Sequence, residues 1–367
     1  MMHRRDFLTS SAAIAAAAAL PRGAFAQATF APKPGEWRSF EIVTRLEVAN
    51  QGGPAQAWVP IPSVNEAGWF KTLDNQWTSN GKATLARDPK YGAAMVHVEW
   101  PASAQIPTVE VTSRISTRDR AVDLAVPGKA AALPAEDRKL YTAATTHIPT
   151  DGIVKETSDK IVAGAKAATD LEKVRAFYEW IVENTYRDAK TRGCGIGDIA
   201  ALLKSGNLGG KCADLNALFV GFARAQEIPA RDIYGIRVAP SAFGYKALGA
   251  NSATITKAQH CRAEVHLAGF GWVPMDPADV RKVVLEEPPG NLPIGDDKVA
   301  AARRALFGAW ETNWLAYNFA HDLKLPGAKN PELTFLMYPQ AETVAGRLDC
   351  LDADTFKYAI TARPIAA

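Results

Sequence analysis

The sequence has little cysteine and little net charge, and each shortage excludes a class of protein. Its 367 residues include four cysteines, too few and too scattered for a disulfide scaffold. No two of them form a CxxC pair, so a structural zinc site is not expected. The formal net charge is +3. Residues 1–26 carry three arginines and one aspartate, a net of +2, which leaves +1 for the rest and no electrostatic footprint for nucleic acid or an anionic membrane.

The chain also lacks low-complexity tracts, and after residue 26 it has no apolar run long enough to cross a bilayer. Its hydrophobic share of 47% and charged share of 22% are those of a globular protein, and its length suits two or three domains. We expect no metal and no cofactor.

Residues 1–26 have the pattern of an export signal. An arginine pair at positions 4 and 5, followed by Phe-Leu, resembles the twin-arginine signal of bacteria. A run of small apolar residues and an A-x-A site ending at Ala26 follow it. The apolar run is too short for a membrane anchor, which needs about 20 residues. We therefore predict a mature protein that begins near Gln27 and works in the periplasm or outside the cell, after export in folded form.

Residues 27–133 are expected to form a β-sandwich domain. Four segments have the apolar patterns of half-buried strands: 40–48, 57–62, 93–100 and 108–115. Turn residues separate them at short intervals, which is typical of a sandwich. Pro60 and Pro62 predict an edge position for the second segment, because proline cannot donate to a neighbouring strand.

Helical periodicity dominates the next part of the chain, and strands follow it. Helices are predicted at 136–145, 153–165, 171–184 (with Asp170 as N-cap) and 198–205, strands at 228–238, 260–267 and 272–277, and a long loop at 239–257. This order of helices and then strands indicates an α+β domain over residues 134–290. The glycine-rich turn at 192–197 lacks the preceding strand and the GK[ST] ending of a phosphate loop.

Residues 291–367 are expected to be a C-terminal extension made of a helix and strands. The pattern predicts a helix over 300–318 and strands at 333–338 and 355–360. It leaves open whether this extension completes the core or forms a small cap domain.

Cys212 is predicted to lie in the first turn of a helix. Residues 209–219 read GGKCADLNALF, and from Leu215 onward apolar residues recur at helical spacing. A helix N-terminus carries about half a positive charge and free N–H groups, so it favours a thiolate over a thiol. Asp214 weakly opposes this effect. On this segment alone, the alternative is an inert cysteine buried on a packed helix.

A later predicted strand contains a candidate partner for Cys212, the histidine at position 260. Residues 260–267 read HCRAEVHL, and period-two alternation separates an apolar face from a polar face that carries His260, Arg262, Glu264 and His266. That polar face is either solvated or part of a site. Asp276 follows across a glycine turn, and because the strands of such a hairpin lie side by side, its carboxylate can reach the imidazole of His260.

Cys212, His260 and Asp276 are therefore predicted to form a catalytic triad. A thiolate attacks a carbonyl carbon. The imidazole keeps the sulfur ionised and then protonates the leaving amine. The carboxylate fixes the tautomer and orientation of the imidazole.

The same residues resemble the transglutaminase-like superfamily. Residues 210–219 (GKCADLNALF) and 223–231 (ARAQEIPAR) are similar to its G-x-C-x-D and R-A-x-G-I-P-A-R runs, while 260–265 (HCRAEV) and 271–277 (GWVPMDP) are similar to its H-x-x-x-E-V and G-W-V-x-x-D-P runs. The resemblance covers residues 170–280. It implies a papain-like α+β core with Cys-His-Asp catalysis and no metal requirement, and the β-rich segment before it is compatible with the accessory domain of many bacterial members.

The resemblance assigns the base to His260 and leaves His266 as a site-lining or surface residue. Two departures stand out. Cys261 and Arg262 occupy positions where a small residue and tryptophan are common, and Glu227 occupies one where glycine is usual. Arg262 on the site face could favour a substrate carboxylate, since a guanidinium binds one through two hydrogen bonds.

Two further groups are candidates to stabilise the oxyanion of the intermediate. The backbone N–H of Cys212 points from the helix start, and Tyr186, just after the preceding helix, is a second candidate. Glu264 is expected to line the site beside Arg262.

The sequence thus predicts an exported cysteine-dependent hydrolase or acyltransferase. It would act on amide or peptide bonds through a thioester, on a peptide or protein substrate such as a cell-envelope peptide. Hydrolysis is favoured over cross-linking because water is always available and no dedicated amine site is recognisable. Protein cross-linking or deamidation is the alternative within the family, and a non-catalytic binding module that keeps the fold is the alternative from another class. A further interpretation pairs Cys194 with Cys212 or Cys261 in a structural disulfide.

Overall fold

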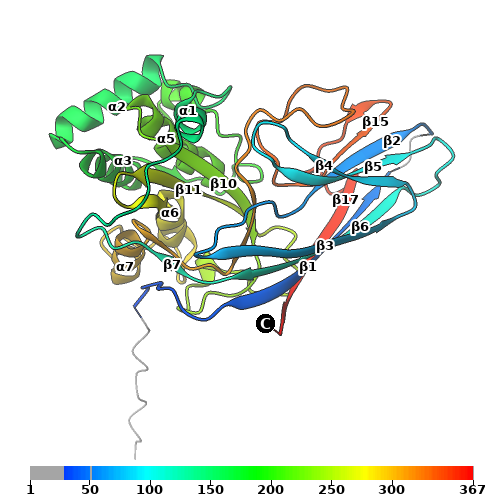
Figure 1. Ribbon diagram of the computed structural model, residues 1–367, viewed down its shortest axis with the longest axis horizontal. Coiled ribbons are helices and arrows are strands. Elements are labelled where there is room, and N and C mark those ends of the chain that lie inside the picture. The colour runs from blue at the N-terminus through cyan, green and yellow to red at the C-terminus, as the bar shows by residue number, and fades with distance from the viewer. Residues whose placement is uncertain (1–28, 50–51, 367) are drawn as a thin grey trace, which may run out of the picture.

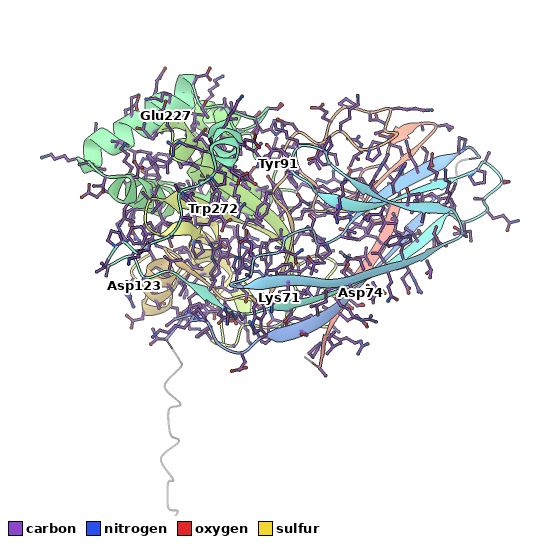
Figure 2. All side chains as sticks on the ribbon, viewed as in Figure 1. Lys71, Asp74, Tyr91, Asp123, Glu227 and Trp272 are labelled. Carbon is purple, nitrogen blue, oxygen red and sulfur yellow. The ribbon has the colours of Figure 1, made fainter. Side chains whose placement is uncertain are left out.

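The computed structural model describes residues 29–49 and 52–366, and the predicted signal at residues 1–26 lies outside them. Helices gather around one sheet at one end of the molecule, and two sheets face each other at the other end (Figure 1). Figure 2 shows side chains filling the space between these parts. Among the described residues, no helix combines the length and apolar character needed to span a bilayer. The predicted α+β class is confirmed.

The β-rich end is a sandwich of two sheets. One sheet has the order β17-β1-β6-β3 and the other β16-β15-β2-β5-β4. The strands are β1 (Arg38–Val48), β2 (Ala55–Pro60), β3 (Phe70–Ser79), β4 (Lys82–Arg87), β5 (Ala94–Trp100), β6 (Thr108–Thr117), β15 (Gln340–Thr343), β16 (Gly346–Arg347) and β17 (Phe356–Ile365). Leu46, Val59, Val96 and Val111 are buried between the two sheets.

The predicted edge position of the second segment is wrong. β2 lies between β15 and β5, because a strand from the C-terminal part of the chain pairs with it. Its proline is tolerated because Pro60 is the last residue of the strand. The sequence pattern also missed β3 and β4, in which many residues are exposed on both faces, so that apolar alternation is weak.

The C-terminal residues complete sheets begun elsewhere. β17 pairs with β1 along its whole length, from Ser39 opposite Ile365 to Val48 opposite Phe356. The strand predicted at 355–360 is confirmed. The helix predicted over 300–318 ends early: α7 spans Asp297–Ala305, and the residues after it form β13 (Ala309–Trp310) and β14 (Trp314–Asn318).

Two other expectations about residues 291–367 concern the strand at 333–338 and the cap domain. No strand forms over 333–338, where Leu333 makes only an isolated bridge with Leu323. The open question about a cap domain is resolved, because β14 joins the sheet of the helical end while β15 and β17 join the sandwich. The division of the chain at residues 133 and 290 stays a prediction.

The helical end is built on a four-stranded antiparallel sheet with the order β12-β11-β10-β14. Its other strands are β10 (Ala230–Arg237), β11 (Gln259–Leu267) and β12 (Gly271–Met275). The helices of this end are α1 (Ala135–Thr142), α2 (Gly152–Ala165), α3 (Asp170–Asn184), α4 (Ile199–Ser205), α5 (Cys212–Ala225) and α6 (Pro277–Glu286). α5, α1 and α3 pack on the sheet, and α2, α4 and α6 pack on α5. Because α5 touches the sheet and several other helices, nearly all of its residues are buried, as expected for a helix apolar on all sides.

Local capping explains several helix ends. α3 starts one residue earlier than predicted, because Thr169 rather than Asp170 is the N-cap: Thr169 Oγ1 accepts the N–H of Glu172 at 3.2 Å, and the Glu172 carboxylate accepts the N–H of Thr169 at 2.9 Å. After α5, Glu227 has a φ of 58°. That left-handed conformation favours glycine, which gives a physical reason for the glycine usual at this position.

Candidate active site

Cys212 is the first residue of α5 and is buried. Asp214 in the same helical turn holds a second loop against it. One carboxylate oxygen accepts the backbone N–H groups of Ile196 and Gly197 at 3.1 and 3.0 Å, and the other accepts that of Lys211 at 2.9 Å. The backbone N–H of Ala213 also donates to the carbonyl of Cys194 at 2.9 Å. These contacts place the Cys194 thiol beside the Cys212 thiol.

Gly195 is required for this arrangement. Its φ is +90°, and a Cβ there would lie 1.9 Å from the Asp214 carboxylate. Any other residue would separate the loop from the start of α5. The glycine-rich turn at 192–197 therefore positions Cys194, which the sequence indicated only as a candidate disulfide partner.

His260 and Asp276 meet as the hairpin pattern predicts. β11 and β12 pair in antiparallel fashion, with Ala263 opposite Met275, and Asp276 directly follows β12. Nε2 of His260 lies 2.8 Å from Oδ2 of Asp276, and both residues are buried. Asp276 is also the N-cap of α6, since its Oδ1 accepts the N–H of Asp279 at 3.1 Å. The sequence missed this helix.

Neighbouring groups hold the imidazole and the carboxylate in place. Asn216 donates from Nδ2 to Oδ1 of Asp276 at 3.2 Å and to the carbonyl of Cys261 at 2.8 Å. Trp314 donates from Nε1 to the carbonyl of His260 at 2.9 Å. Gly235 makes room for this tryptophan, because a Cβ at that position would lie 2.5 Å from the indole ring. An amide among the otherwise apolar residues 215–223 was the sequence signal that could have revealed Asn216.

A second carboxylate lies next to the first. Oδ2 of Asp279 is 3.4 Å from Nε2 of His260. Arg237 holds Asp279 through two hydrogen bonds of 2.6 and 2.7 Å, and all three side chains are buried. Sequence reasoning missed both residues, although Asp279 lies only three positions after Asp276.

These surroundings shift the pKa values of Cys212 and His260 in opposite directions. Burial raises the pKa of the Cys212 thiol, but hydrogen bonds from Cys194, Cys261 and His260 and the charge of His260 bring it well below its usual value. Burial lowers the pKa of His260, but the carboxylates of Asp279 and Asp276 outweigh burial and Arg237 and raise it to about 9. A thiolate–imidazolium pair is therefore the favoured state at neutral pH.

The two carboxylates differ in charge environment. Burial and the neighbouring Asp279 raise the pKa of Asp276, against the lowering effect of His260. Arg237 and His260 overcome burial and hold the pKa of Asp279 well below its usual range. His260, Asp276 and Asp279 have ligand atoms within 4.8 Å of one another, a grouping that could hold a metal ion. Arg237 and Arg262, which lie 2.6 Å from Asp279 and 3.6 Å from Asp276, oppose a cation there.

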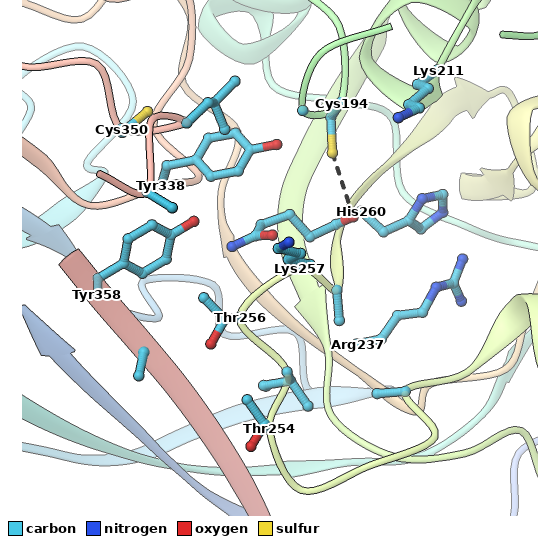
Figure 3. A pocket seen from close by; sticks show the side chains of 18 of the residues that line it. Cys194, Lys211, Arg237, Thr254, Thr256, Lys257, His260, Tyr338, Cys350 and Tyr358 are labelled. Atoms are coloured by element: carbon cyan, nitrogen blue, oxygen red, sulfur yellow. Dashed lines mark hydrogen bonds between the residues drawn. The ribbon is translucent and has the colours of Figure 1, made fainter. Parts of the chain in front are cut away.

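Cys212 and His260 open onto a cavity of about 840 Å³ between the two ends of the molecule. Its lining includes Cys212 and His260, the loop predicted at 239–257, and residues 356–359 of β17. Figure 3 shows Tyr338 and Tyr358 on one side of the cavity and His260 and Arg237 on the other. A cavity of this size accommodates a segment of peptide.

None of the four predicted oxyanion or lining side chains borders the cavity: Tyr186, Glu264, His266 and Arg262. Tyr186 is 42% exposed, and its hydroxyl donates to Asn207 at 2.6 Å. Glu264 is fully buried in ion pairs with Arg120 and Arg231.

His266, the third of these residues, packs edge-on against Trp272, labelled in Figure 2, with ring centroids 5.4 Å apart. His260 itself remains at the cavity.

Arg262 lies behind His260 and Asp276 rather than in the cavity. It is buried beside the rings of Trp310 and Trp314, donates to the carbonyl of Glu311 at 2.9 Å, and lies 3.6 Å from Asp276. The polar face of β11 is thus neither solvated nor a substrate surface beyond His260. Strand alternation identifies a face correctly, but it cannot show that other segments cover it.

All four cysteines are free thiols in the structure, so the interpretation with a structural disulfide is not supported. Cys194, Cys212 and Cys261 are buried, and Cys350 is partly exposed.

Comparisons with known proteins agree with this geometry. A sequence model described as transglutaminase-like superfamily matches residues 155–277, and one for the twin-arginine translocation pathway signal matches residues 1–21. An uncharacterized protein of Haemophilus influenzae is 38% identical over 321 residues, which cover 83% of this chain and 85% of the relative.

A solved structure shares the fold at low identity. A candidate cysteine protease from Cytophaga hutchinsonii has a TM-score of 0.50 and 14% identity, covering 90% of this chain and 99% of that protein. The periplasmic domain of TgpA from Pseudomonas aeruginosa has a TM-score of 0.33 and 13% identity, covering 67% of this chain and 88% of that one.

Proposed function

The chain belongs to the transglutaminase-like superfamily and carries a twin-arginine signal for export to the periplasm or beyond, and from this premise we propose that it is a cysteine-dependent hydrolase of amide or peptide bonds. One observation carries the proposal. Cys212 begins a buried helix and accepts a hydrogen bond from His260, whose Nε2 contacts Asp276 at 2.8 Å, and both Cys212 and His260 line the same cavity.

The proposed reaction starts from the thiolate–imidazolium pair. The Cys212 thiolate attacks the substrate carbonyl carbon, and the backbone N–H at the start of α5 stabilises the resulting oxyanion. The C–N bond then breaks as the His260 imidazolium gives its proton to the leaving amine. The product left on the enzyme is a thioester of Cys212.

Water completes the cycle. Neutral His260 takes a proton from a water molecule, whose oxygen attacks the thioester carbonyl. Collapse of that intermediate releases a carboxylic acid and returns the sulfur as a thiolate beside protonated His260. The roles of Asp276 and Asn216 are to hold the imidazole ring so that Nδ1 faces the sulfur.

The charge of the cavity favours hydrolysis over cross-linking. Lys211, Lys257, Lys282 and Lys357 all line it, and Glu47 is the single carboxylate among the lining residues. An amine acceptor such as a lysine side chain arrives as a cation, which these side chains repel, whereas water carries no charge. Deamidation of a glutamine side chain would follow the same steps as peptide hydrolysis.

Trapping the acyl-enzyme tests the proposal. Purified mature protein would be incubated briefly with a periplasmic extract, quenched with acid, and examined by mass spectrometry for an acyl group on Cys212. We expect a thioester adduct that hydroxylamine removes and that Cys212→Ala lacks. If Cys212 forms no adduct and reacts with iodoacetamide no faster than free cysteine, the protein is a binding module that keeps the fold.

A further inference from the structure

We propose that the cavity binds an acidic peptide in extended form along the free edge of β17, with Lys257 and Lys357 facing the peptide carboxylates. This inference rests on the proposed function, because it names the substrate class of the same site. The charges that line the cavity and the hydrogen-bonding groups that β17 leaves open support this inference.

The basic side chains of the cavity fall into two groups. Four of the arginines already have carboxylate partners: Arg45 with Glu110, Arg187 with Glu286, Arg192 with Asp349 and Arg237 with Asp279. Lys211, Lys257 and Lys357 make no ion pair with any described residue. Unpartnered lysines clustered around a concave site attract an anion.

Glu47, the acidic residue that lines the cavity, does not cancel the positive charge of these lysines. Glu47 stands opposite Lys357 in the register of β1 and β17, yet the two side chains do not form an ion pair in the structure. The cavity therefore has a positive potential, although the whole chain is close to neutral. This contrast indicates a local anion site and not a basic protein surface in general.

β17 is the outermost strand of its sheet, and residues 253–256 cover its far edge from Ile360 onward. Thr254 bridges Thr361, and the N–H of Ala362 donates to the carbonyl of Ala253 at 2.9 Å. Ile360 accepts the backbone N–H of Ile255 at 2.8 Å and donates its own N–H to Oγ1 of Thr256 at 2.9 Å. The backbone groups of Ile360 therefore point away from β1. Because this direction repeats every second residue, the N–H and C=O of Tyr358 point the same way, toward the cavity.

The side chains of β17 agree with a cavity at the strand edge. Four consecutive residues, 356–359, line the cavity. Consecutive side chains of a strand point to opposite faces, so a cavity that meets all four must run along the edge. An extended peptide can add to such an edge through backbone hydrogen bonds, while its side chains meet the surrounding groups.

Tyr358 of β17 and His260 lie on opposite sides of the same cavity (Figure 3), and Cys212 also lines it. A peptide held along β17 would therefore present a carbonyl to Cys212 with its acidic side chains near Lys257 and Lys357. The phenol rings of Tyr338 and Tyr358 supply apolar contact next to these cations.

Alkylation of Cys212 tests the charge argument without a known substrate. Iodoacetate is an anion and iodoacetamide is its neutral counterpart, so the ratio of their rate constants reports the potential at the sulfur. At low salt we expect this ratio to exceed that of free cysteine by about tenfold, and to fall as salt is added. The double variant Lys257→Glu/Lys357→Glu should lower the ratio severalfold while leaving the iodoacetamide rate nearly unchanged.

A matched control distinguishes the effect of charge in the cavity from the effect of the protein's net charge. Lys129→Glu/Lys160→Glu makes the same change in charge at exposed positions outside the cavity, and it should leave the ratio unchanged. Equal ratios in both double variants and the parent protein would overturn the inference. Slow alkylation of Cys212 by both reagents in the parent protein would instead overturn the proposed function.

Peptide pairs then test the substrate class. Each pair would share one sequence with Glu or Gln at a single position, and cleavage would be followed by mass spectrometry. We expect the Glu member of at least one pair to have a kcat/KM about tenfold higher, mainly through a lower KM, and Lys257→Glu/Lys357→Glu to remove that preference. Efficient cleavage with no preference at any position would reject the inference and keep the hydrolase.

Discussion

Oδ2 of Asp276 lies 2.8 Å from Nε2 of His260, although 16 residues separate the two in the chain. The contact forms because β11 and β12 pair and because Asp276 is fixed as the N-cap of α6. One carboxylate thus ends a strand, starts a helix and orients the imidazole. The predictions below follow from this arrangement and from the groups around it.

Two histidines on the same strand should behave differently. Cys212→Ala and His260→Ala should abolish hydrolysis, because they remove the nucleophile and its proton partner. His266→Ala should retain most activity, because His266 packs against Trp272 and does not line the cavity. Turnover of a peptide substrate measures all three variants, and a dead His266→Ala with an active His260→Ala would reverse the assignment.

Asp276→Asn should reduce kcat by about 10³–10⁴-fold, because an amide no longer fixes the tautomer of His260. Asp279→Asn should cause a smaller loss, since the contact of Asp279 with Nε2 is longer, at 3.4 Å. Circular dichroism would verify that both variants fold. Equal losses would mean that the two carboxylates orient the ring together.

The pH dependence of kcat/KM should have two limbs. On the acid side, activity appears as Cys212 loses its proton, well below the usual range of a thiol because its pKa is lowered. On the alkaline side, activity declines near pH 9 as His260 loses the proton that the leaving amine needs. Asp279→Asn should move the alkaline limb to lower pH, because Asp279 raises the pKa of His260.

Cys194 is expected to tune the nucleophile. Its hydrogen bond lowers the pKa of Cys212, so Cys194→Ala should raise that pKa and shift the pH profile of iodoacetamide labelling upward. Cys194→Ser keeps a hydrogen-bond donor and should largely restore the parent profile. Identical profiles for Cys194→Ala and the parent would show that the contact does not influence the thiolate.

Glu264 is expected to stabilise the fold and not to act in the reaction. Glu264→Gln leaves Arg120 and Arg231 without their buried partner and should lower the free energy of unfolding by about 3–5 kcal/mol. Glu110→Gln, which breaks the exposed pair with Arg45, should cost about 1 kcal/mol or less. Denaturant unfolding of both variants, monitored by tryptophan fluorescence, provides the comparison.

Local patterns were sufficient to predict the elements that carry Cys212 and His260. The helical spacing after Cys212 and the alternation after His260 depend only on neighbouring residues, and the structure contains both elements. The sequence pattern failed where segments distant in the chain determine what a side chain contacts. The polar face of β11 is covered by Trp310 and Trp314, and no feature of residues 260–267 indicates that cover.

The missed residues have the same explanation. Arg237 and Asp279 lie 42 positions apart and meet only because β10 and α6 pack near each other. Residues 310–318 were predicted to be helical because they are apolar, but burial beside β10 makes Trp314 to Asn318 a strand. Apolar content predicts burial, whereas the partner surface determines the secondary structure.

The position of β17 determines when the cavity around Cys212 and His260 is complete during synthesis. Cys212 and His260 leave the ribosome long before residues 356–359, which form one wall of their cavity. β1 is synthesised early, but the edge of β1 that pairs with β17 stays unpaired until β17 has been synthesised. The cavity is therefore incomplete on a nascent chain that lacks β17, even after Cys212 and His260 have been translated.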